Sequence, residues 1–220
     1  MSDTTNWKQE PRVVSVSPLP SSEAKWSELQ KITWTDQTGK SRVWEAANRK
    51  TRGSTGVDAI AIAPILLHPK RPTQTLIIKQ FRPPLDAFCI EFPAGLVDEG
   101  ESIEDAAVRE LREETGYAGK LVSITPTIGN DPGLTTATMQ FAVVECAFSE
   151  HDPPPDQHLD TGEFIERFII PLDELYEKLM EFSTQKGVMV DARLFHFAAG
   201  IQFMKENGSR YGLNLGSSKM

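Results

Sequence analysis

Three glutamates near the middle of the chain lie at a spacing that could hold a metal ion. Glu110, Glu113 and Glu114 occupy positions i, i+3 and i+4, so on a helix they share one face and their carboxylates repel one another. A divalent cation would offset this repulsion, and Mg²⁺ typically binds one or two carboxylates together with water and phosphate oxygens. We therefore expect a metal-binding face, with Arg109 and Arg112 pointing elsewhere. The alternative is a solvated helix face on which glutamates and arginines form ordinary ion pairs.

The residues around these glutamates specify a helix with two defined ends. Ser102 is suited to cap the amino terminus, with Asp105 three residues later at the capping-box position, and Gly116 is suited to end the helix. The sequence predicts a helix from Ile103 to Thr115, which would carry the three glutamates on one side.

The rest of the chain predicts a mixed domain with a small appendage. From Trp26 to Trp44 the sequence indicates two extended segments around a turn at 36–39, whose Asp and Gly suit a tight reversal. We predict a β-rich segment over residues 1–55 and a main domain over residues 56–220. Apolar patterns in the main domain predict strands at 59–67, 75–80, 138–148 and 164–170 and helices at 172–182 and 190–205. Such a mixture is typical of α+β or layered α/β/α domains.

Charge and composition argue against several classes of partner. The net charge is −8, from 31 acidic and 23 basic residues, whereas nucleic acids and anionic membranes need a cationic surface. The most apolar stretch, at 59–67, is too short to cross a bilayer. Cys89 and Cys146 lack metal-ligand spacing, which favours buried reduced thiols inside the cell. We expect a cytoplasmic protein, with the nucleus as the alternative, and no nucleic-acid or membrane partner.

The flanks of the predicted helix carry a known motif. Gly95 is followed by Glu101, then by the run Arg109 to Tyr117, which reads Arg-Glu-Leu-Arg-Glu-Glu-Thr-Gly-Tyr. Every fixed position of the Nudix box is present, and chance would match seven fixed letters less than roughly once in ten million starting positions. The chain therefore resembles the Nudix hydrolases. This resemblance implies an α/β/α sandwich in which a loop, a helix and a loop present metal ligands to a diphosphate.

The resemblance also implies roles for single residues. Glu110 and Glu114 match the metal ligands of the family, Glu113 matches an additional ligand, and the backbone carbonyl of Ala94 matches a further one. The implied cofactor is Mg²⁺, with Mn²⁺ as an alternative, at two or three ions per active site. Metal ions on a diphosphate withdraw charge from phosphorus and lower the pKa of a bound water. Arg109 is expected to orient a carboxylate, for which Glu101 is the candidate.

Four further segments resemble the ADP-ribose and ADP-sugar pyrophosphatases within this family. They lie at 80–84, 90–96, 131–134 and 162–164. By this likeness Glu163 matches a glutamate proposed to act as the general base in related enzymes. A glutamate on a loop is otherwise most often simply exposed, so that alternative stays open.

Two tryptophans of the N-terminal segment are candidates for the nucleotide. In similar enzymes the residues that match Trp26 and Trp44 sandwich the adenine, one from each subunit of a homodimer that exchanges its amino-terminal segments. Stacking between a base and an aromatic ring contributes about 1 to 3 kcal/mol per base. The alternative for both residues is ordinary packing in a core or an interface, which is also the role expected for Trp34.

Other candidates for substrate contact are dispersed along the chain. Arg49 and Arg82 could bind the phosphates or the terminal ribose, because a guanidinium suits bidentate contact with phosphate oxygens; surface ion pairs are the alternative. Asp58 and Asp131 match positions that contact ribose or order the site, and Leu96 matches a position where the backbone approaches the ligand.

The function that the resemblance implies is Mg²⁺-dependent hydrolysis of ADP-ribose to AMP and ribose 5-phosphate, with the diphosphates of other ADP-sugars as a wider substrate class. One alternative is a hydrolase of oxidised nucleoside diphosphates or of other nucleoside-diphosphate sugars. A second is a regulatory module that binds ADP-ribose without catalysis, against which the complete set of three helix glutamates argues.

Overall fold

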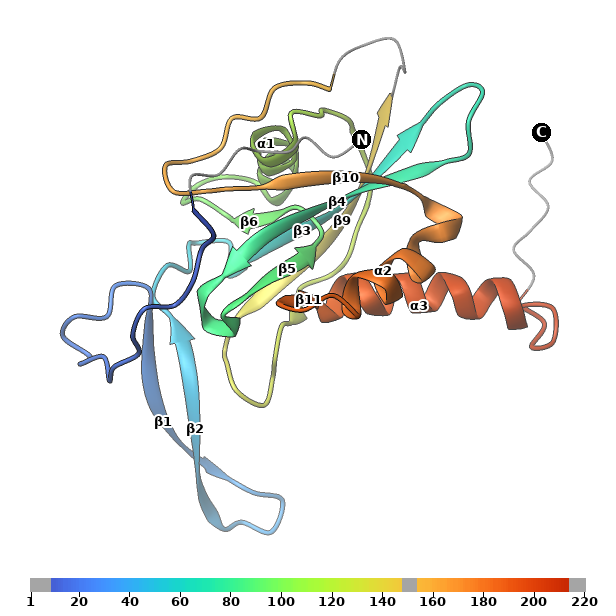
Figure 1. Cartoon of the computed structure of the whole chain (residues 1–220). Coiled ribbons are helices and arrows are strands. Elements are labelled where there is room, and N and C mark those ends of the chain that lie inside the picture. The colour runs from blue at the N-terminus through green and yellow to red at the C-terminus, as the bar shows by residue number, and fades with distance from the viewer. Residues whose placement is uncertain (1–8, 148–153, 214–220) are drawn as a thin grey trace.

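A mixed β-sheet lies at the centre of the computed structural model, which describes residues 9–147 and 154–213 (Figure 1). Within these residues nine strands form the sheet, in the order β11-β5-β4-β3-β9-β7, with β10 beside β4, β6 beside β3 and β8 beside β9. The strands are β3 (Ala59–Leu67), β4 (Gln74–Arg82), β5 (Ala87–Glu91), β6 (Ala94–Leu96), β7 (Lys120–Ile124), β8 (Ile128–Gly129), β9 (Thr138–Ala147), β10 (Glu166–Pro171) and β11 (Val188–Val190). The pairs β3 with β9 and β5 with β11 are parallel, and the other pairs are antiparallel.

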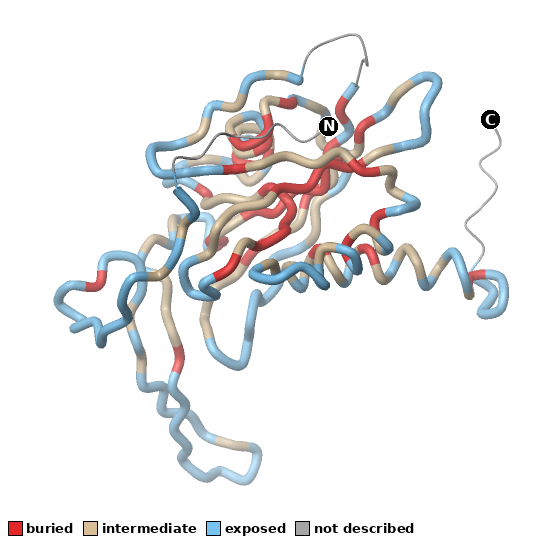
Figure 2. Tube along the Cα trace, in the orientation of Figure 1, coloured by how far each residue is buried: buried red, intermediate tan, exposed pale blue. Residues whose placement is uncertain are grey.

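Helices cover both faces of this sheet. Helix α1 (Ile103–Thr115) lies on one face, and α2 (Leu175–Ser183) and α3 (Ala192–Asn207) lie on the other (Figure 1). Strand β4 shows why both faces are apolar: Leu76 and Ile78 join the cluster under α1, whereas Ile77 joins the cluster under α2 and α3. The buried residues accordingly run through the middle of the molecule (Figure 2). The layered α/β/α fold predicted from the sequence is confirmed.

Helix α1 has the ends that the sequence predicts. The Ser102 hydroxyl accepts a hydrogen bond from the Asp105 amide at 3.1 Å. Gly116 ends the helix at φ +76°, and a side chain there would overlap the backbone carbonyl of Asp156. Glycine is therefore required at this position for conformation and for space.

Some predicted boundaries differ from the observed ones in the carboxyl-terminal part. The predicted helix at 190–205 begins two residues later, because the Asp191 side chain caps it by accepting from the amides of Arg193 and Leu194. The preceding residues form β11, which pairs with β5. The helix predicted at 172–182 begins with a 3₁₀ turn, η2 (Leu172–Glu174). The strand predicted at 138–148 ends at Ala147, beyond which Phe148 lies outside the described residues.

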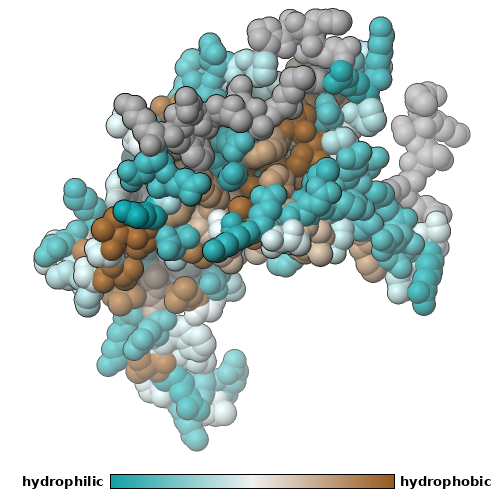
Figure 3. Space-filling view, viewed as in Figure 1, coloured by the Kyte–Doolittle hydropathy of each residue, from teal (hydrophilic) through white to brown (hydrophobic). Residues whose placement is uncertain are grey.

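The predicted appendage is a two-stranded hairpin that projects away from the sheet (Figure 1). It consists of β1 (Ser27–Thr35) and β2 (Ser41–Arg49), whose turn is closed by the Asp36 side chain accepting from the amides of Thr38 and Lys40. Apolar surface remains visible over part of it (Figure 3). A two-stranded hairpin alone is only marginally stable, so contacts with the main domain must support it.

The cysteines and the helices bear on the expectations from the composition. Cys89 and Cys146 are free and buried, as the sequence predicts. Across residues 9–147 and 154–213, every helix is too short or too polar to cross a bilayer.

Candidate functional site

Glu114 is a buried carboxylate at the centre of the site. It lies on α1 with only 3% of its surface exposed, and it accepts a hydrogen bond from the Ala94 amide at 3.0 Å. Burial raises the pKa of Glu114 well above its usual value, and the negative charges of Glu110 and Glu163 raise it further. The Ala94 peptide, which the sequence predicts to supply a ligand, thus lies directly beside the helix carboxylates.

Glu110 lies against β6, the strand that precedes the helix. Its carboxylate occupies the space that a side chain at Gly95 would need, so any larger residue at this position would displace the Glu110 carboxylate. Burial raises the pKa of Glu110, as do the charges of Glu113 and Glu163, although Arg109 lowers it. Ionised oxygens crowded in this way are an environment that favours a bound cation.

Arg109 connects the loop carboxylate to the helix carboxylates. Its guanidinium binds both oxygens of Glu101 at 2.8 Å and the carbonyl of Leu96 at 3.0 Å, and it also reaches Glu110 at 2.8 Å and Glu113 at 3.0 Å. Arg109 thus contacts Glu101, the carboxylate that it was predicted to orient. The prediction that Arg109 points away from the shared face is wrong, because its guanidinium lies between the two sets of carboxylates and offsets their combined charge.

Glu163 lies within electrostatic reach of the helix carboxylates. Its negative charge raises the pKa of both Glu110 and Glu114. Its own carboxylate accepts from the Asp160 amide at 3.1 Å, and its amide donates to the Asp160 carbonyl at 3.0 Å. The fold therefore brings this distant loop residue to the site, inside a tight turn.

Arg82 is bound to a second buried glutamate. Its Nε and Nη2 donate to the two oxygens of Glu91, each at 2.6 Å, and Glu91 is 3% exposed. The hydrogen bonds that Arg82 donates to Glu91 raise the pKa of Arg82, and the charge of Glu114 contributes. About 40% of the Arg82 side chain is exposed, so the guanidinium is fixed on one side and open on the other.

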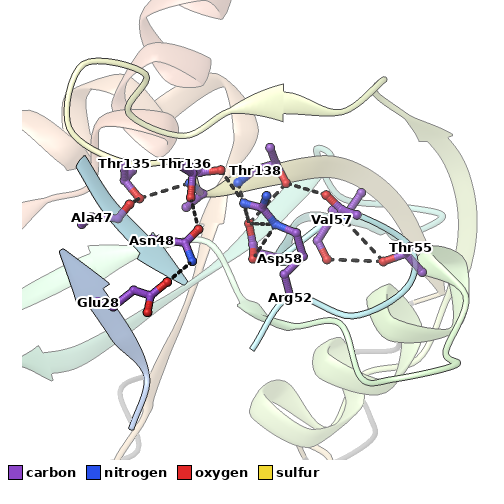
Figure 4. A network of polar contacts seen from close by, with 12 residues as sticks. Glu28, Ala47, Asn48, Arg52, Thr55, Val57, Asp58, Thr135, Thr136 and Thr138 are labelled. Atoms are coloured by element: carbon purple, nitrogen blue, oxygen red, sulfur yellow. Dashed lines mark hydrogen bonds and ion pairs between the residues drawn. The ribbon is translucent and has the colours of Figure 1, made fainter. Parts of the chain in front are cut away.

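Asp58 is enclosed by a polar network at the start of β9 (Figure 4). Its carboxylate accepts from Arg52 at 2.7 Å and from the Thr138 amide at 2.8 Å, and its backbone carbonyl accepts from Val97 at 3.3 Å. Two roles were open for Asp58, contact with ribose and ordering of the site. With its carboxylate buried and bonded, the geometry favours ordering.

The hairpin joins the main domain through the loop at 131–136. The Ala47 amide donates to the Leu134 carbonyl at 2.8 Å, and the Thr136 amide donates back to Ala47 at 3.0 Å. The Trp44 indole donates to the Gly133 carbonyl at 3.1 Å, and Asn48 bridges Thr136 and Glu28 (Figure 4).

The remaining predicted substrate contacts lie near this junction or on β6. Trp26 and Trp44 are 66% and 50% exposed. Arg49 is the last residue of β2 and is half-buried. Asp131 is exposed at the start of the loop, where its backbone carbonyl accepts hydrogen bonds from the amides of Leu134 and Thr135. Leu96 presents its carbonyl to Arg109.

Comparison with known proteins identifies the family. The model of the NUDIX domain matches residues 59–191. The chain belongs to the Nudix family. An uncharacterised Nudix hydrolase of Schizosaccharomyces pombe is 48% identical over 88% of this chain and 94% of the relative. An ADP-ribose pyrophosphatase of Saccharomyces cerevisiae is 45% identical, over 84% of this chain and 80% of the relative, and an ADP-sugar pyrophosphatase of Mus musculus is 35% identical, over 82% and 84%.

A solved structure supports the Nudix fold. The crystal structure of an ADP compounds hydrolase superposes with a TM-score of 0.53 over 93% of this chain and 99% of that chain, at 19% identity. At this level of identity the similarity concerns the fold alone.

The donor set of this Nudix hydrolase fits the divalent cations that the family generally uses. The described residues contain no group of three or more metal-binding side chains already arranged to hold an ion, and Arg109 hydrogen-bonds to both Glu110 and Glu113. Mg²⁺ does not need such a preformed group, because it usually retains waters and takes one or two carboxylates with substrate phosphates. Glu114, Glu110 and the Ala94 carbonyl provide hard oxygen donors of that kind.

Four residues of the Nudix site escaped the sequence-based prediction. They are Arg52, Glu91, Gln157 and Arg167; the first two bind Asp58 and Arg82 within ten residues along the chain, and the last two bind carbonyls of α1 more than 40 residues away. Glu91 gave a usable signal, because a charged residue within the apolar strand β5 needs a buried partner. Gln157 gave none, since glutamine in a polar loop is common.

Proposed function

We propose that the chain hydrolyses the diphosphate of ADP-ribose to AMP and ribose 5-phosphate, and the diphosphate of other ADP-sugars to AMP and the corresponding sugar phosphate. The observation that carries this proposal is the complete set of helix carboxylates, packed against Ala94 and Gly95 in a chain 45% identical to an ADP-ribose pyrophosphatase. The 35% identity with an ADP-sugar pyrophosphatase supports the wider substrate class.

We assign the metal-binding roles to Glu110, Glu113, Glu114 and the Ala94 carbonyl, with Mg²⁺ or Mn²⁺ at two or three ions. When bound, such ions would withdraw charge from the diphosphate and lower the pKa of an attacking water. Arg109 orients the carboxylates through the contacts described above.

We assign Glu163 as the general base that removes the proton from the attacking water. Its support is the electrostatic coupling to Glu110 and Glu114. Because its carboxylate lies in the turn with Asp160, substrate binding would have to redirect it towards the water.

On the nucleotide side we assign Trp26 and Trp44 to the adenine, and Arg49 and Arg82 to the phosphates and the terminal ribose. Arg82 suits this role because Glu91 fixes one side of its guanidinium and leaves the other side open. Asp131 and Leu96 would line the ligand from the loop and from β6, and Asp58 would order the junction between them.

We also propose a homodimer in which residues 1–55 serve dimerisation and adenine binding while residues 56–220 form the hydrolase domain. The hairpin supports this, because Leu29 and Val43 on one face and Ile32 on the other remain exposed. Apolar side chains exposed on a projecting element are typical of association surfaces.

Sedimentation of the full chain tests the dimer. We expect the mass of two chains, and a monomer at every concentration would overturn the proposal. Leu29→Lys and Ile32→Lys then identify the interface, because they place a charge on opposite faces of the hairpin.

Product analysis tests the activity. Purified protein with Mg²⁺ is offered ADP-ribose, ADP-glucose and an oxidised nucleoside diphosphate, and AMP release is measured. We expect ADP-ribose to be cleaved and Glu114→Gln to lose the metal-dependent rate while retaining the fold. If only the oxidised nucleotide is cleaved, the assignment of ADP-ribose as the substrate is wrong. If ADP-ribose binds but is not cleaved, the chain is a regulatory module and not an enzyme.

A further inference from the structure

The loop that carries Glu163 is fastened directly to the carboxyl-terminal end of α1. The last carbonyls of any α-helix lack donors within the helix and need partners elsewhere. Here the Gln157 side-chain amide donates to the Glu114 carbonyl at 2.6 Å, and the His158 amide donates to the Glu113 carbonyl at 2.8 Å. Arg167 donates to the Thr115 carbonyl at 2.7 Å. Three consecutive carbonyls of the last turn are thus satisfied by this loop and by β10, the strand that follows it.

The same side chains also close the loop on itself. Gln157 reaches the Ile165 carbonyl at 3.2 Å, and Arg167 reaches the Pro155 carbonyl at 2.6 Å. A side chain at Gly116 would lie 2.8 Å from that Pro155 oxygen, so the absence of a Cβ allows the close approach. Both ends of the loop are therefore held against the helix, and the stretch at 159–164 lies between the fixed points.

Glu163 lies in this short stretch, in a turn of its own. Gly162 adopts φ +96°, which favours glycine, and Asp160 and Glu163 exchange two hydrogen bonds across the turn. Contacts within the turn can break without disturbing the anchors, because Gln157 and Arg167 bind the helix and the loop ends instead.

We propose that Gln157 and Arg167 are positioning residues that set the distance between Glu163 and the carboxylates of Glu110 and Glu114. The inference rests on the proposed function in that Glu163 acts on the attacking water. The carbonyls that Gln157 and its neighbour bind belong to Glu114 and Glu113, whose own side chains face the site. One hydrogen bond therefore joins the backbone of a metal-binding residue to the loop of the base. A misplacement of about 1 Å can cost roughly 100-fold in rate.

The test compares Gln157→Met with a matched variant. Methionine keeps the length of the side chain and removes both donors. Gln140→Met is the control. Gln140 lies on strand β9, and its side-chain amide likewise donates to a backbone carbonyl, that of Thr125, at 2.8 Å. We expect Gln157→Met to lower kcat for ADP-ribose about 10- to 100-fold with KM within about twofold, and Gln140→Met to leave both near wild type.

A second readout needs neither metal nor turnover. In the metal-free protein we expect Gln157→Met to speed hydrogen exchange at the His158 amide, whose bond to Glu113 lies beside the lost anchor. Glu163→Gln should leave that amide protected. Arg167→Lys, which retains the charge on a single donor nitrogen, should give a kcat between those of wild type and Arg167→Met.

The outcomes separate this inference from the proposed function. If Glu163→Gln lowers kcat but Gln157→Met matches Gln140→Met, the positioning role is overturned and the proposed function stands. Unchanged exchange at His158 in Gln157→Met also overturns it. If Glu163→Gln retains the wild-type kcat, the base assignment and the inference both fail. Should Gln157→Met not fold, the Arg167→Lys and Arg167→Met pair decides by the same kcat comparison.

Discussion

The two ends of the site are built in different ways. Around α1 the carboxylates are largely buried, the helix has two caps, and Arg109, Ala94 and the loop at 154–163 supply specific partners. The hairpin of β1 and β2 has no third strand within the described residues, and its tryptophans Trp26 and Trp44 remain at least half exposed. The carboxylates around α1 are therefore positioned by contacts within one chain. The surface proposed to bind adenine is exposed, and a ligand or a second copy of the chain would have to cover it.

Hydrogen bonds connect the hairpin to the segment around α1. The hairpin and the main domain meet through Ala47, Asn48 and the loop at 131–136, and from there Arg52 connects the loop to Asp58 (Figure 4). The Asp58 carbonyl accepts from Val97, just after the strand β6 that carries Leu96 and Ala94. A continuous set of hydrogen bonds thus runs between the exposed end and the buried end.

The largest expected effect lies at the end around α1. Glu110→Gln should lower kcat by roughly 10³-fold, because charge stabilisation by a metal contributes several kcal/mol to the transition state. Glu104→Gln is the matched control, since Glu104 is exposed on the first turn of the same helix. Steady-state rates over a range of Mg²⁺ concentrations check this, and equal kcat values for the two variants would contradict the assignment of the metal face.

The next prediction concerns the connection between the two ends. Arg52→Met should destabilise the fold by about 3 to 5 kcal/mol at neutral pH, because it leaves the Asp58 carboxylate buried without its cation. Urea unfolding measures this loss. Arg42→Met is the control, because Arg42 forms a similar 2.8 Å ion pair with Asp36 at the exposed end of the hairpin, and we expect a clearly smaller loss there.

The same variant has a predicted pH dependence. Burial raises the pKa of Asp58, but the bonds from Arg52 and Thr138 outweigh it and leave the pKa below its usual value. The stability from Asp58 is therefore present above the unfolded pKa of about 3.9 and is lost as the pH falls through the lower folded pKa. The difference between wild type and Arg52→Met should shrink towards pH 3. If the difference in the free energy of unfolding between the two proteins stays constant from pH 7 to pH 3, the ionisation of Asp58 is not its cause.

The smallest expected effect lies at the exposed end. Trp44→Ala should raise KM for ADP-ribose roughly 5- to 150-fold with little change in kcat, because stacking on a base contributes about 1 to 3 kcal/mol. Trp44→Phe should restore most of the loss. Trp34→Ala serves as the control, as Trp34 is on the same hairpin and is assigned to packing alone. Equal KM values for Trp44→Ala and Trp34→Ala would contradict the assignment of Trp44 to adenine binding.

Local sequence determined most elements near the chemistry. Ser102 and Gly116 specify the ends of α1, the spacing of Glu110, Glu113 and Glu114 places them on one side, and Asp36 and Gly39 specify the turn of the hairpin. These predictions succeed because caps and tight turns depend on residues within a few positions of one another.

What only the tertiary structure decided is which distant residues meet. The pairing of β4 with β5 brings Arg82 beside Glu91, and the packing of the loop against α1 brings Gln157 to Glu114, 43 residues away. The direction of Arg109 was wrong in the sequence-based prediction for the same reason, because it depends on where Glu101 and Leu96 lie in space. The sequence by itself thus determined the helix that carries the three glutamates, and the fold decided which side chains hold that helix to the loop of Glu163.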